Sequence, residues 1–541
     1  MSENKVSAPN EYSAFKQGEV QVDSVTLINQ EMEFIDLSTI CTNIKLYEGI
    51  DKTFVSGRIS IVDAHDLIKY FKITGQESLT IRIKARDEDE TSESPFITVI
   101  DRVFKVYAVS DGKVEGNMQY YTLSFIDPNA FIAEQKRISQ TLRGSYSDIL
   151  LKVWQEHVKY GNDPNTYTDH WEETSPATNA ITVPNWTINQ LITYILSNAS
   201  GKKMMWKNSY FFFDTVCKPP GAKNKHKPAG QYRFMSLKTM ANDMQIPVAF
   251  DPYPRTAIVA GENISVNMPQ QGLNTQILHY ERPQTANTRK GAVEGAYASK
   301  LIAYDPIRKM TIHKKYSIKD VYDRDENVEP LGWFGWMGYD KKTWPIIRTK
   351  FLAPHKIGNK QEDEEGENYM WASPPDAVGN INTSPEGYVH DPGGEIAADA
   401  LTVMKVNMTN AYSDDDKLFD KNTATSVSNN WVGDEWNDTG PLERHALLSL
   451  FEQQNVKVSI PFRPDIVCGS TIQLNIPTYE PEDERIVNKF NTGAYIITKA
   501  VYDINPIKNT GVIQLNCVKD SFAVDVTKYY PRTELDQKTG N

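Results

Sequence analysis

The chain has 541 residues, with 58 Lys and Arg against 70 Asp and Glu, so its formal net charge is -12. Apolar residues make up 40% and charged residues 24%, which is typical of a folded globular protein of three or four domains. The acidic balance argues against a general nucleic-acid coat, which needs a basic surface for phosphate contacts. No apolar run approaches the roughly 20 residues that span a bilayer, so we expect no stable membrane insertion. Residues 1–20 are polar and lack a basic region followed by an apolar one, so we expect no secretory signal.

The four cysteines are widely spaced and form no CxxC pair: Cys41, Cys217, Cys468 and Cys517. This spacing predicts neither a disulfide framework nor a zinc site, and we expect four buried thiols. The 27 Tyr and 10 Trp are a richer signal, because large amphipathic aromatic side chains are favoured at protein interfaces.

Residues 18–131 alternate apolar and polar side chains in short runs, which is typical of antiparallel strands. The predicted strands are 53–61, 79–83, 96–100, 104–109 and 120–126. The segment 63–70, DAHDLIKY, predicts a short helix, and the acidic run 86–93 predicts a solvated turn. The sequence therefore predicts a tube-like antiparallel β-barrel domain over residues 1–132.

The next stretch changes to helical spacing and predicts an α+β domain over residues 133–260. Its expected elements are two helices and a hairpin: a helix over 147–159 with Ser145 or Ser147 as its N-cap, a helix capped by Thr187, and strands at 203–206 and 210–215.

A basic loop follows at 218–233. Its cations are Lys218, Lys223, Lys225, Lys227 and Arg233. The loop could contact DNA or an acidic partner, but we favour a solvated loop that balances an acidic protein.

Six of the ten tryptophans fall in residues 284–439: Trp333, Trp336, Trp344, Trp371, Trp431 and Trp436. We interpret this stretch as a large Trp-rich insertion domain whose aromatics serve its own core and a subunit contact; a sugar-binding platform is the alternative. Its acidic groups 362–365 and 414–416 lack the alternating ligand spacing of a calcium loop.

Strands return near the end of the chain. A helix over 442–454 is predicted to precede strands at 456–460, 470–476, 494–502 and 511–518. These strands, with earlier ones at 261–283, predict a second tube-like β-barrel domain over 261–283 and 440–522, split by the insertion. A polar C-terminal tail over 523–541 completes the predicted domains.

The two β-rich regions resemble each other. At a constant offset of 392 residues, 104–125 aligns without gaps to 496–517, matching Ala108 to Ala500, Val109 to Val501, Asp111 to Asp503 and Leu123 to Leu515. Upstream, 75–83 parallels 469–476, a turn glycine leading into an alternating strand. The fold class is therefore predicted as α+β, mainly β, with duplicated barrels. Three such chains would present six similar domains around one axis.

This layout resembles the baseplate central hub proteins of T-even-type contractile-tailed bacteriophages, which are related to the hub part of type VI secretion spike proteins. Three segments carry the resemblance: GRISIVDAHDLIKYFKITGQESLTIRI at 57–83, VPNWTINQLITYILSNASGKKMMWKNSYFFF at 183–213, and VKVSIPFRPDIVCGSTIQLNIP at 456–477. The chain departs from that family in its much larger insertion.

The resemblance implies a structural protein that forms a homotrimeric ring with pseudo-sixfold symmetry, placed in the virion tail baseplate and assembled in the host cytoplasm. The implied partners are a central spike protein, tail tube or tube-initiator proteins, baseplate wedge proteins, and DNA that passes through the lumen without specific binding. We expect the loops 51–53 and 480–483 to meet neighbouring subunits or the tube, and the tail 523–541 to order against the spike.

Motifs of catalysis are scarce. We find no phosphate loop, HExxH, GxSxG or GxGxxG pattern, and we predict no enzyme activity, catalytic residue, cofactor or metal site. The acid–base clusters are Asp169, His170, Glu172 and Glu173, and Asp63, His65 and Asp66. A glycosidase needs two carboxylates facing across a cleft, which adjacent residues do not imply. The alternative function is a tail-associated glycan-binding protein or glycan hydrolase that uses the Trp-rich insertion.

Overall fold

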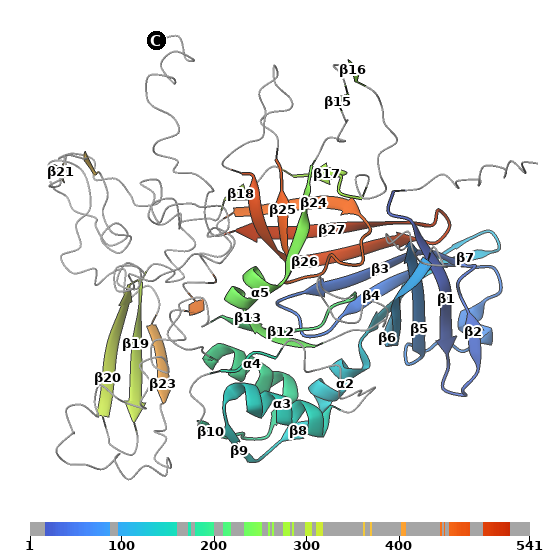
Figure 1. Ribbon diagram of the computed structural model, residues 1–541. Helices are drawn as coiled ribbons and strands as arrows, with labels where there is room; N and C mark the ends of the chain where they lie inside the picture. Colours follow the sequence, from blue (N-terminus) through green and yellow to red (C-terminus); the bar gives the residue numbers. More distant parts are fainter. Residues whose placement is uncertain are drawn as a thin grey trace, which may run out of the picture.

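The computed structural model describes residues 17–86, 96–158, 171–174, 179–199, 209–217, 232–251, 274–281, 454–476 and 491–519, together with short segments between 258 and 448. The described chain is mainly β, as the alternating pattern predicts. Figure 1 shows one large twisted sheet, with a group of helices on its lower side.

The large sheet has 14 strands that come from both ends of the chain. The first half contributes β1 (Val20–Ile28), β2 (Phe34–Asp36), β3 (Cys41–Gly49), β4 (Ser56–Asp63), β5 (Ser78–Arg86), β6 (Phe96–Glu115) and β7 (Met118–Ile126). The second half contributes β14 (Gln245–Phe250), β17 (His279–Tyr280), β18 (Gln284–Thr285), β24 (Gln454–Pro461), β25 (Thr471–Leu474), β26 (Gly493–Asn505) and β27 (Thr510–Lys519).

Each half contains a unit of four antiparallel strands in the same order. The first unit runs β4-β7-β6-β5, and the second runs β24-β27-β26-β25. Both hairpins have an irregularity at the same place, after Val106 opposite Phe125 in the first unit and after Ile497 opposite Cys517 in the second. Because Phe125 and Cys517 are 392 residues apart, the second hairpin strands correspond at the offset of the sequence repeat.

The first hairpin strands correspond at a different offset. Val109 lies opposite Leu123, whereas Ala500 lies opposite Leu515, so Val109 corresponds to Ala500 at an offset of 391. The gapless alignment is therefore one residue out of step along β6 and β26. A one-residue slip turns a side chain to the other face of a strand, so the matches of Ala108 and Val109 in that alignment are not structural equivalences.

The match of Asp111 to Asp503 fails by two residues. Asp111 has a left-handed φ of 59° and lies at an irregularity between Ser110 and Lys113. Past this bulge, Lys113 lies opposite Tyr120 and Asp503 lies opposite Val512. Since Tyr120 and Val512 are also 392 residues apart, Lys113 is the residue that corresponds to Asp503.

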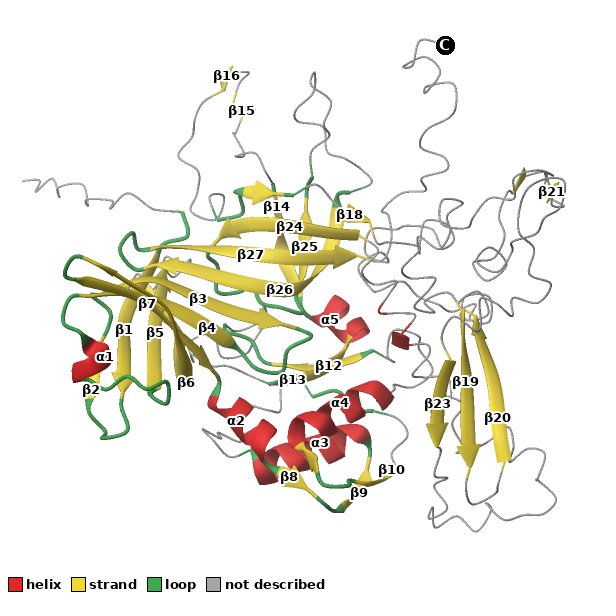
Figure 2. Cartoon of the chain, turned by 180° about the vertical axis from the view of Figure 1, so that it is seen from behind, coloured by secondary structure: helices red, strands yellow, loops and turns green. Residues whose placement is uncertain are grey.

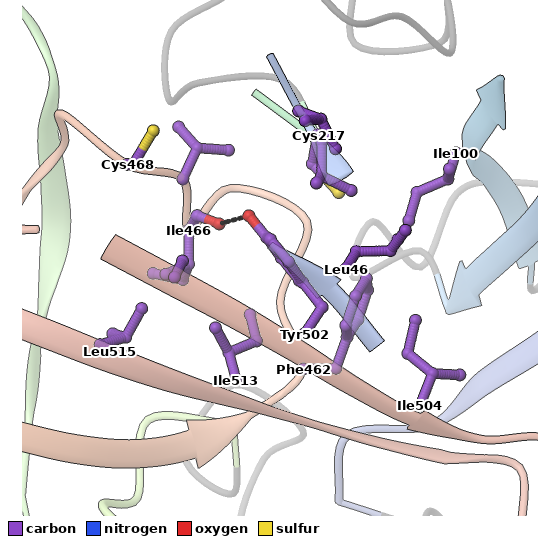
Figure 3. Packing of buried hydrophobic residues seen from close by; sticks show 14 of the residues in the cluster. Leu46, Ile100, Cys217, Phe462, Ile466, Cys468, Tyr502, Ile504, Ile513 and Leu515 are labelled. Carbon is purple, nitrogen blue, oxygen red and sulfur yellow. Dashed lines mark hydrogen bonds between the residues drawn. The ribbon is translucent and has the colours of Figure 1, made fainter. Parts of the chain in front are cut away.

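The two units are hydrogen-bonded to each other through β3 and β26 and share one continuous hydrophobic cluster. The expected barrels are thus parts of one sheet with a common core. One pair in this sheet, β14 with β25, is parallel, where the sequence predicts antiparallel strands alone. Figure 3 shows the shared core, in which Leu46, Ile100, Phe462 and Tyr502 come from both halves.

The strands that the sequence predicts at 96–100 and 104–109 are one strand, β6, of 20 residues. Its first half pairs with β5 and its second half pairs with β7. The predicted helix at 63–70 is shorter, α1 (Leu67–Tyr70).

The helical part has a second core below the sheet (Figure 2). It contains α2 (Pro128–Gln135), α3 (Tyr146–His157) and α4 (Ile188–Asn198), with the short strands β8 (Arg137–Ile138), β9 (Thr141–Gly144), β10 (Asn179–Thr182) and β11 (Trp186–Thr187). The side chain of Ser145 caps α3, and Thr187 forms a capping box with Gln190 on α4. Both predicted caps are confirmed. Trp154 is fully buried at the centre of this core.

The hairpin of β12 (Tyr210–Phe213) and β13 (Arg233–Ser236) lies between the two cores. Phe211 and Phe213 belong to the core of the sheet, whereas Tyr210 and Phe212 belong to the helical core. Successive side chains of a strand point to opposite faces, so the aromatic run YFFF suits a strand buried on both sides. The predicted partner strand 203–206 lies outside the described residues, and β12 pairs with β13 instead. The helix α5 (Leu237–Asp243) then leads into β14.

The remaining strands are short or form small sheets: β15 (Ile258–Val259), β16 (Glu262–Asn263), β19 (Ala298–Asp305), β20 (Met310–Ser317), β21 (Gln361–Glu362), β22 (Asn368–Tyr369) and β23 (Thr402–Val406). The six tryptophans of the predicted insertion lie outside the described residues. The helix predicted over 442–454 ends earlier than expected, since Gln454 begins β24.

Candidate functional site

The seam between the two units is the best-defined candidate site. Residues Lys499 to Ile504 of β26 pair antiparallel with Gly49 to Ile44 of β3. At this seam Lys45 Nζ lies 3.3 Å from Asp503 Oδ2, and the side-chain amide of Asn43 donates to Asp503 Oδ1 at 2.9 Å. Lys45 lies directly opposite Asp503 and Asn43 is a diagonal neighbour, and both kinds of cross-strand contact add to the backbone ladder.

The carboxylate of Glu48 joins three parts of the chain beneath this seam. It accepts hydrogen bonds from the backbone N–H of Val216 and of Cys468, each at 2.6 Å. The hydroxyl of Tyr502 lies 2.9 Å from Glu48 Oε1. It also lies 2.7 Å from the carbonyl oxygen of Ile466, the contact drawn in Figure 3. Glu48 therefore connects the first unit, the segment 209–217 and the second unit.

Burial raises the pKa of Glu48 to about 7, and the two backbone N–H groups and Tyr502 act in the opposite direction. A single hydroxyl proton on Tyr502 cannot serve both Glu48 and Ile466. When Tyr502 donates to Ile466, a protonated Glu48 can donate to the Tyr502 oxygen. The geometry is thus compatible with a neutral carboxyl group, which burial favours.

A second buried network lies on β6. The guanidinium of Arg102 donates to Asp127 Oδ2 at 2.6 Å, to the carbonyl oxygen of Thr215 at 3.0 Å, and to Asp214. Burial alone would lower the pKa of Arg102, but the two carboxylates beside it raise the pKa above its usual value. This network fastens β6 to the segment 209–217 and to the start of α2.

Arg233 is a further buried cation near this network. The sequence places it in a basic solvated loop, but its side chain is fully buried and donates to Thr215 Oγ1 at 2.7 Å. Burial lowers the pKa of Arg233. It begins β13, whose hydrogen bonding to β12 carries it into the core. Residues 218–231 of the predicted loop lie outside the described residues.

The acid–base clusters of the sequence have structural roles where they are described. The carboxylate of Asp63 accepts from the backbone N–H of His65 at 2.7 Å and of Leu67 at 2.6 Å, which holds the turn that leads into α1. Glu172 accepts from the backbone N–H of Ser236 at 2.7 Å and from Thr239 Oγ1 at 2.7 Å, at the start of α5. Asp169 and His170 lie outside the described residues.

In the loop 51–53, Asp51 forms an ion pair within the chain: its Oδ2 lies 2.9 Å from Nζ of Lys499 on β26. The loop predicted at 480–483 and the tail 523–541 lie outside the described residues. All four cysteines are free and buried, as their spacing predicts. Burial raises the pKa of the Cys217 and Cys468 thiols, so they are poor nucleophiles.

The sequence analysis missed Glu48 and Arg102, although the strand alternation contains a signal for both. Ile44, Leu46 and Glu48 share one face of β3 by their spacing of two. Arg102 likewise lies between the buried Ile100 and Phe104 on β6. A charged residue at a position that alternation assigns to the core needs a buried partner, and that conflict could have identified both networks.

No described helix is long and apolar enough to cross a membrane. Within the described ranges, no group of three His, Cys, Asp or Glu side chains is placed to hold a metal ion.

No protein-family model and no curated protein matches the sequence. Among solved structures, the tail protein from Neisseria meningitidis MC58 has a TM-score of 0.42 at 11% identity, over 93% of this chain and 98% of that chain. The 43 kDa tail protein of prophage MuSo2 from Shewanella oneidensis has a TM-score of 0.39 at 8% identity, over 93% and 99%. An E. coli protein described as a component of the type VI secretion system has a TM-score of 0.35 at 6% identity, over 95% and 79%.

Proposed function

We propose that the protein is a structural hub of a contractile phage tail. Three chains form a ring of six similar units that joins a sixfold tail tube to a threefold spike and lets DNA pass during ejection. The observation that carries this proposal is the pair of four-strand units joined edge to edge at β3 and β26. Repetition of one edge-to-edge contact around an axis builds a closed ring when the rotation closes.

The buried networks support a structural role for the seam. Glu48 joins the two units and the segment 209–217 through buried hydrogen bonds, and Arg102 joins β6 to the same segment. Removing one partner of such a network leaves buried polar groups unpaired, so the two units keep a fixed relative orientation. A ring that transmits force between a tube and a spike needs this rigidity within each subunit.

The sequence resemblance implies the partners of the proposed ring: the spike, the tube or tube-initiator proteins and the baseplate wedge proteins. It also implies that the protein is located in the virion tail. The net charge of -12 suits a ring through which DNA passes without being held, because like charges repel.

Mass photometry of the purified full chain tests the proposal. We expect a species of three times the 61.4 kDa chain mass, with a central hole in negative-stain images. Pull-down with purified spike and tube proteins then tests whether the ring binds both partners. A stable monomer over the micromolar range, or a trimer without a hole, would contradict the proposed function.

A further inference from the structure

The residues 462–470, here called the 462–470 connection, join β24 to β25 inside the shared core. Three of them, Ile466, Val467 and Cys468, are fully buried. The hydroxyl of Tyr502 on β26 reaches the carbonyl oxygen of Ile466 at 2.7 Å (Figure 3), and no other described group donates to that oxygen. A buried carbonyl group without a donor is costly, so this one hydroxyl proton controls how firmly the connection is held.

The same hydroxyl has a second acceptor. Glu48 Oε1 lies 2.9 Å from the Tyr502 oxygen. When Glu48 carries a proton, it donates that proton to the Tyr502 oxygen, and Tyr502 donates its own to Ile466. When Glu48 is ionised, it can only accept, and it competes with Ile466 for the Tyr502 proton. The carboxylate is the stronger acceptor of the two, because a hydrogen bond to a charged group is stronger than one to a neutral group.

Opposing effects hold Glu48 between these two states. Burial raises its pKa to about 7, and the positive charge of Arg233 acts in the opposite direction. The guanidinium of Arg233 is fully buried, and its Nε and Nη2 atoms have no hydrogen-bond partner among the described residues. An ionised Glu48 therefore gains an attraction to a cation that is only partly paired. The ionised state is thus accessible without unfolding.

The titratable and charged side chains that face Glu48 come from β13, the segment 209–217, the 462–470 connection and β26: Arg233, Cys217, Cys468 and Tyr502. Burial raises the pKa of both thiols and of Tyr502 well above their usual values, so these three groups stay neutral near neutral pH. Asp214 is bonded to Arg102 and lies on the far side of Cys217 in the sequence. A charge change near neutral pH among the facing groups therefore belongs to Glu48.

We propose that Glu48 and Tyr502 form a proton-controlled switch on the 462–470 connection. A protonated Glu48 leaves the Tyr502 hydroxyl on Ile466, which holds the connection against β26. Loss of the Glu48 proton to solvent turns the hydroxyl to Glu48 and leaves the Ile466 carbonyl oxygen without its donor, so the connection opens locally. The switch acts within one chain, so it is independent of the proposed ring.

The strands on either side limit the opening to the connection itself. β24 is paired with β27 from Gln454 to Pro461, and β25 is paired with β26 from Thr471 to Leu474. These ladders do not include the Tyr502 hydroxyl. We therefore expect them to stay closed when the 462–470 connection opens.

Hydrogen–deuterium exchange of the full chain tests the switch. Exchange is compared at about pH 6 and about pH 8, on either side of the Glu48 pKa of about 7, after correction for the intrinsic exchange rate at each pH. In the wild type we expect the protection of the 462–470 connection to fall by about tenfold or more from the lower to the higher pH.

Low concentrations of urea separate local opening from global unfolding. A local opening exposes little surface, so urea should leave the protection of the 462–470 connection at the higher pH unchanged, while the protection of β24 and β27 falls. Protection of the connection that falls with urea in parallel with these strands would overturn the local switch.

Two variants test the two members of the switch. Glu48→Gln does not ionise, and we expect the same protection of the connection at both pH values. Its absolute protection can differ from the wild type because the amide changes the hydrogen bonds, so the readout is the ratio between the two pH values. Tyr502→Phe lacks the hydroxyl, and we expect low protection at both pH values. A wild-type pH dependence in either variant would overturn the switch.

Tyr121→Phe is the matched control. It removes another buried hydroxyl of the same hydrophobic cluster, 3.4 Å from Asp63 Oδ2, and leaves Glu48 and Tyr502 in place. We expect this variant to keep the wild-type pH dependence of the connection. Loss of that dependence in the control would mean that any cavity in the core produces the effect, and would overturn the switch.

Infrared difference spectra report the Glu48 proton directly. In the wild type we expect the C=O stretching band of a protonated carboxyl group to disappear between about pH 6 and about pH 8. Glu48→Gln should lack this change, whereas Tyr502→Phe should keep a protonated carboxyl band, because it still contains Glu48. A wild-type spectrum without the change, or the same change in Glu48→Gln, would overturn the proposal.

Discussion

The two four-strand units share a strand order but have different surroundings. In the second unit, β26 is covered by β3 along the seam, whereas in the first unit the same part of β6 faces solvent. The connections differ as well: α1 lies between β4 and β5, whereas the buried residues Ile466, Val467 and Cys468 lie between β24 and β25. The same hairpin thus serves as core in one unit and as an edge in the other.

This difference teaches that burial in a repeated fold depends on the neighbour rather than on the strand itself. Val114 and Ile504 occupy equivalent positions, and both are β-branched and apolar. Their exposed fractions differ because β3 covers only one of them. Variants at matched positions of the two units test whether the neighbouring strand determines the stability that each position contributes.

The largest effect is expected at the buried end of β6. Arg102→Ala leaves Asp127 and Asp214 buried without their counter-charge, which should lower the free energy of unfolding by about 3–5 kcal/mol. The matched control is Arg82→Ala on β5, which removes an exposed pair with Asp101 and should cost about 1 kcal/mol or less. Urea unfolding curves measure both, and equal losses would contradict the role of the buried network.

The equivalent apolar positions should respond next most strongly. Ile504→Ala removes fully buried methyl groups and should cost about 2–5 kcal/mol in the free energy of unfolding. Val114→Ala at the equivalent exposed position should change it by about 0.5 kcal/mol or less. The unfolding measurement should use dilute protein, so that assembly does not protect Val114. Similar losses at both positions would show that the open edge is covered within the chain.

The raised pKa of Glu48 predicts that the free energy of unfolding depends on pH. Its pKa is raised from 4.5 to about 7 in the folded protein, so the native state holds a proton that the unfolded state releases between these values. Its contribution to stability is therefore present below about pH 4.5 and is lost as the pH rises to about 7, a change of about 3 kcal/mol.

The test compares the slope of unfolding free energy against pH in the wild type and in Glu48→Gln. The amide does not titrate, so we expect the difference between the two proteins to change steadily from pH 5 to pH 7 and to level off above. The readout is this slope, because the amide also alters the hydrogen bonds to Val216 and Cys468. Parallel curves would contradict the raised pKa.

The smallest effect is expected at the seam charges. Asp503→Ala removes the partner of Lys45 and of Asn43 and should cost about 1 kcal/mol, because the pair is partly exposed. Lys113→Ala at the equivalent position should leave the unfolding of the isolated chain within about 0.5 kcal/mol of the wild type. A large loss at Lys113 would mean that β6 is already paired in the monomer.

Local sequence patterns were sufficient to predict several strands and both helix caps. Alternation located β4, β5, β7, β26 and β27 to within a few residues, and side-chain chemistry identified Ser145 and Thr187 as helix caps. Both signals depend on residues close together in the chain. The hairpin repeat was also visible, but its register along β6 was one residue out of step before the bulge and two after it. A gapless alignment cannot represent a bulge, because a bulge inserts an extra, unpaired residue into one strand.

Arg233 and Gln454 show where sequence reasoning failed. Arg233 follows a run of Lys, Pro and Gly that is typical of a solvated loop, yet its pairing with Phe213 draws it into the core. Gln454 follows a helical pattern, yet it pairs with Lys519 as the first residue of β24. In both positions a strand distant in the sequence determines the structure, and no local pattern contains that information.

By itself, the sequence determined the mainly β character, the places of β4 to β7 and of β24 to β27, the helix caps and the buried thiols, because these depend on short-range periodicity and local hydrogen bonds. It did not predict β1, β2 or β3. Only the tertiary structure decided that the two units form one sheet, that Glu48 joins them, and that Arg102 joins β6 to the segment 209–217. These features depend on pairing between strands up to about 460 residues apart in the chain. Such pairing is selected by the whole packed core rather than by either strand alone.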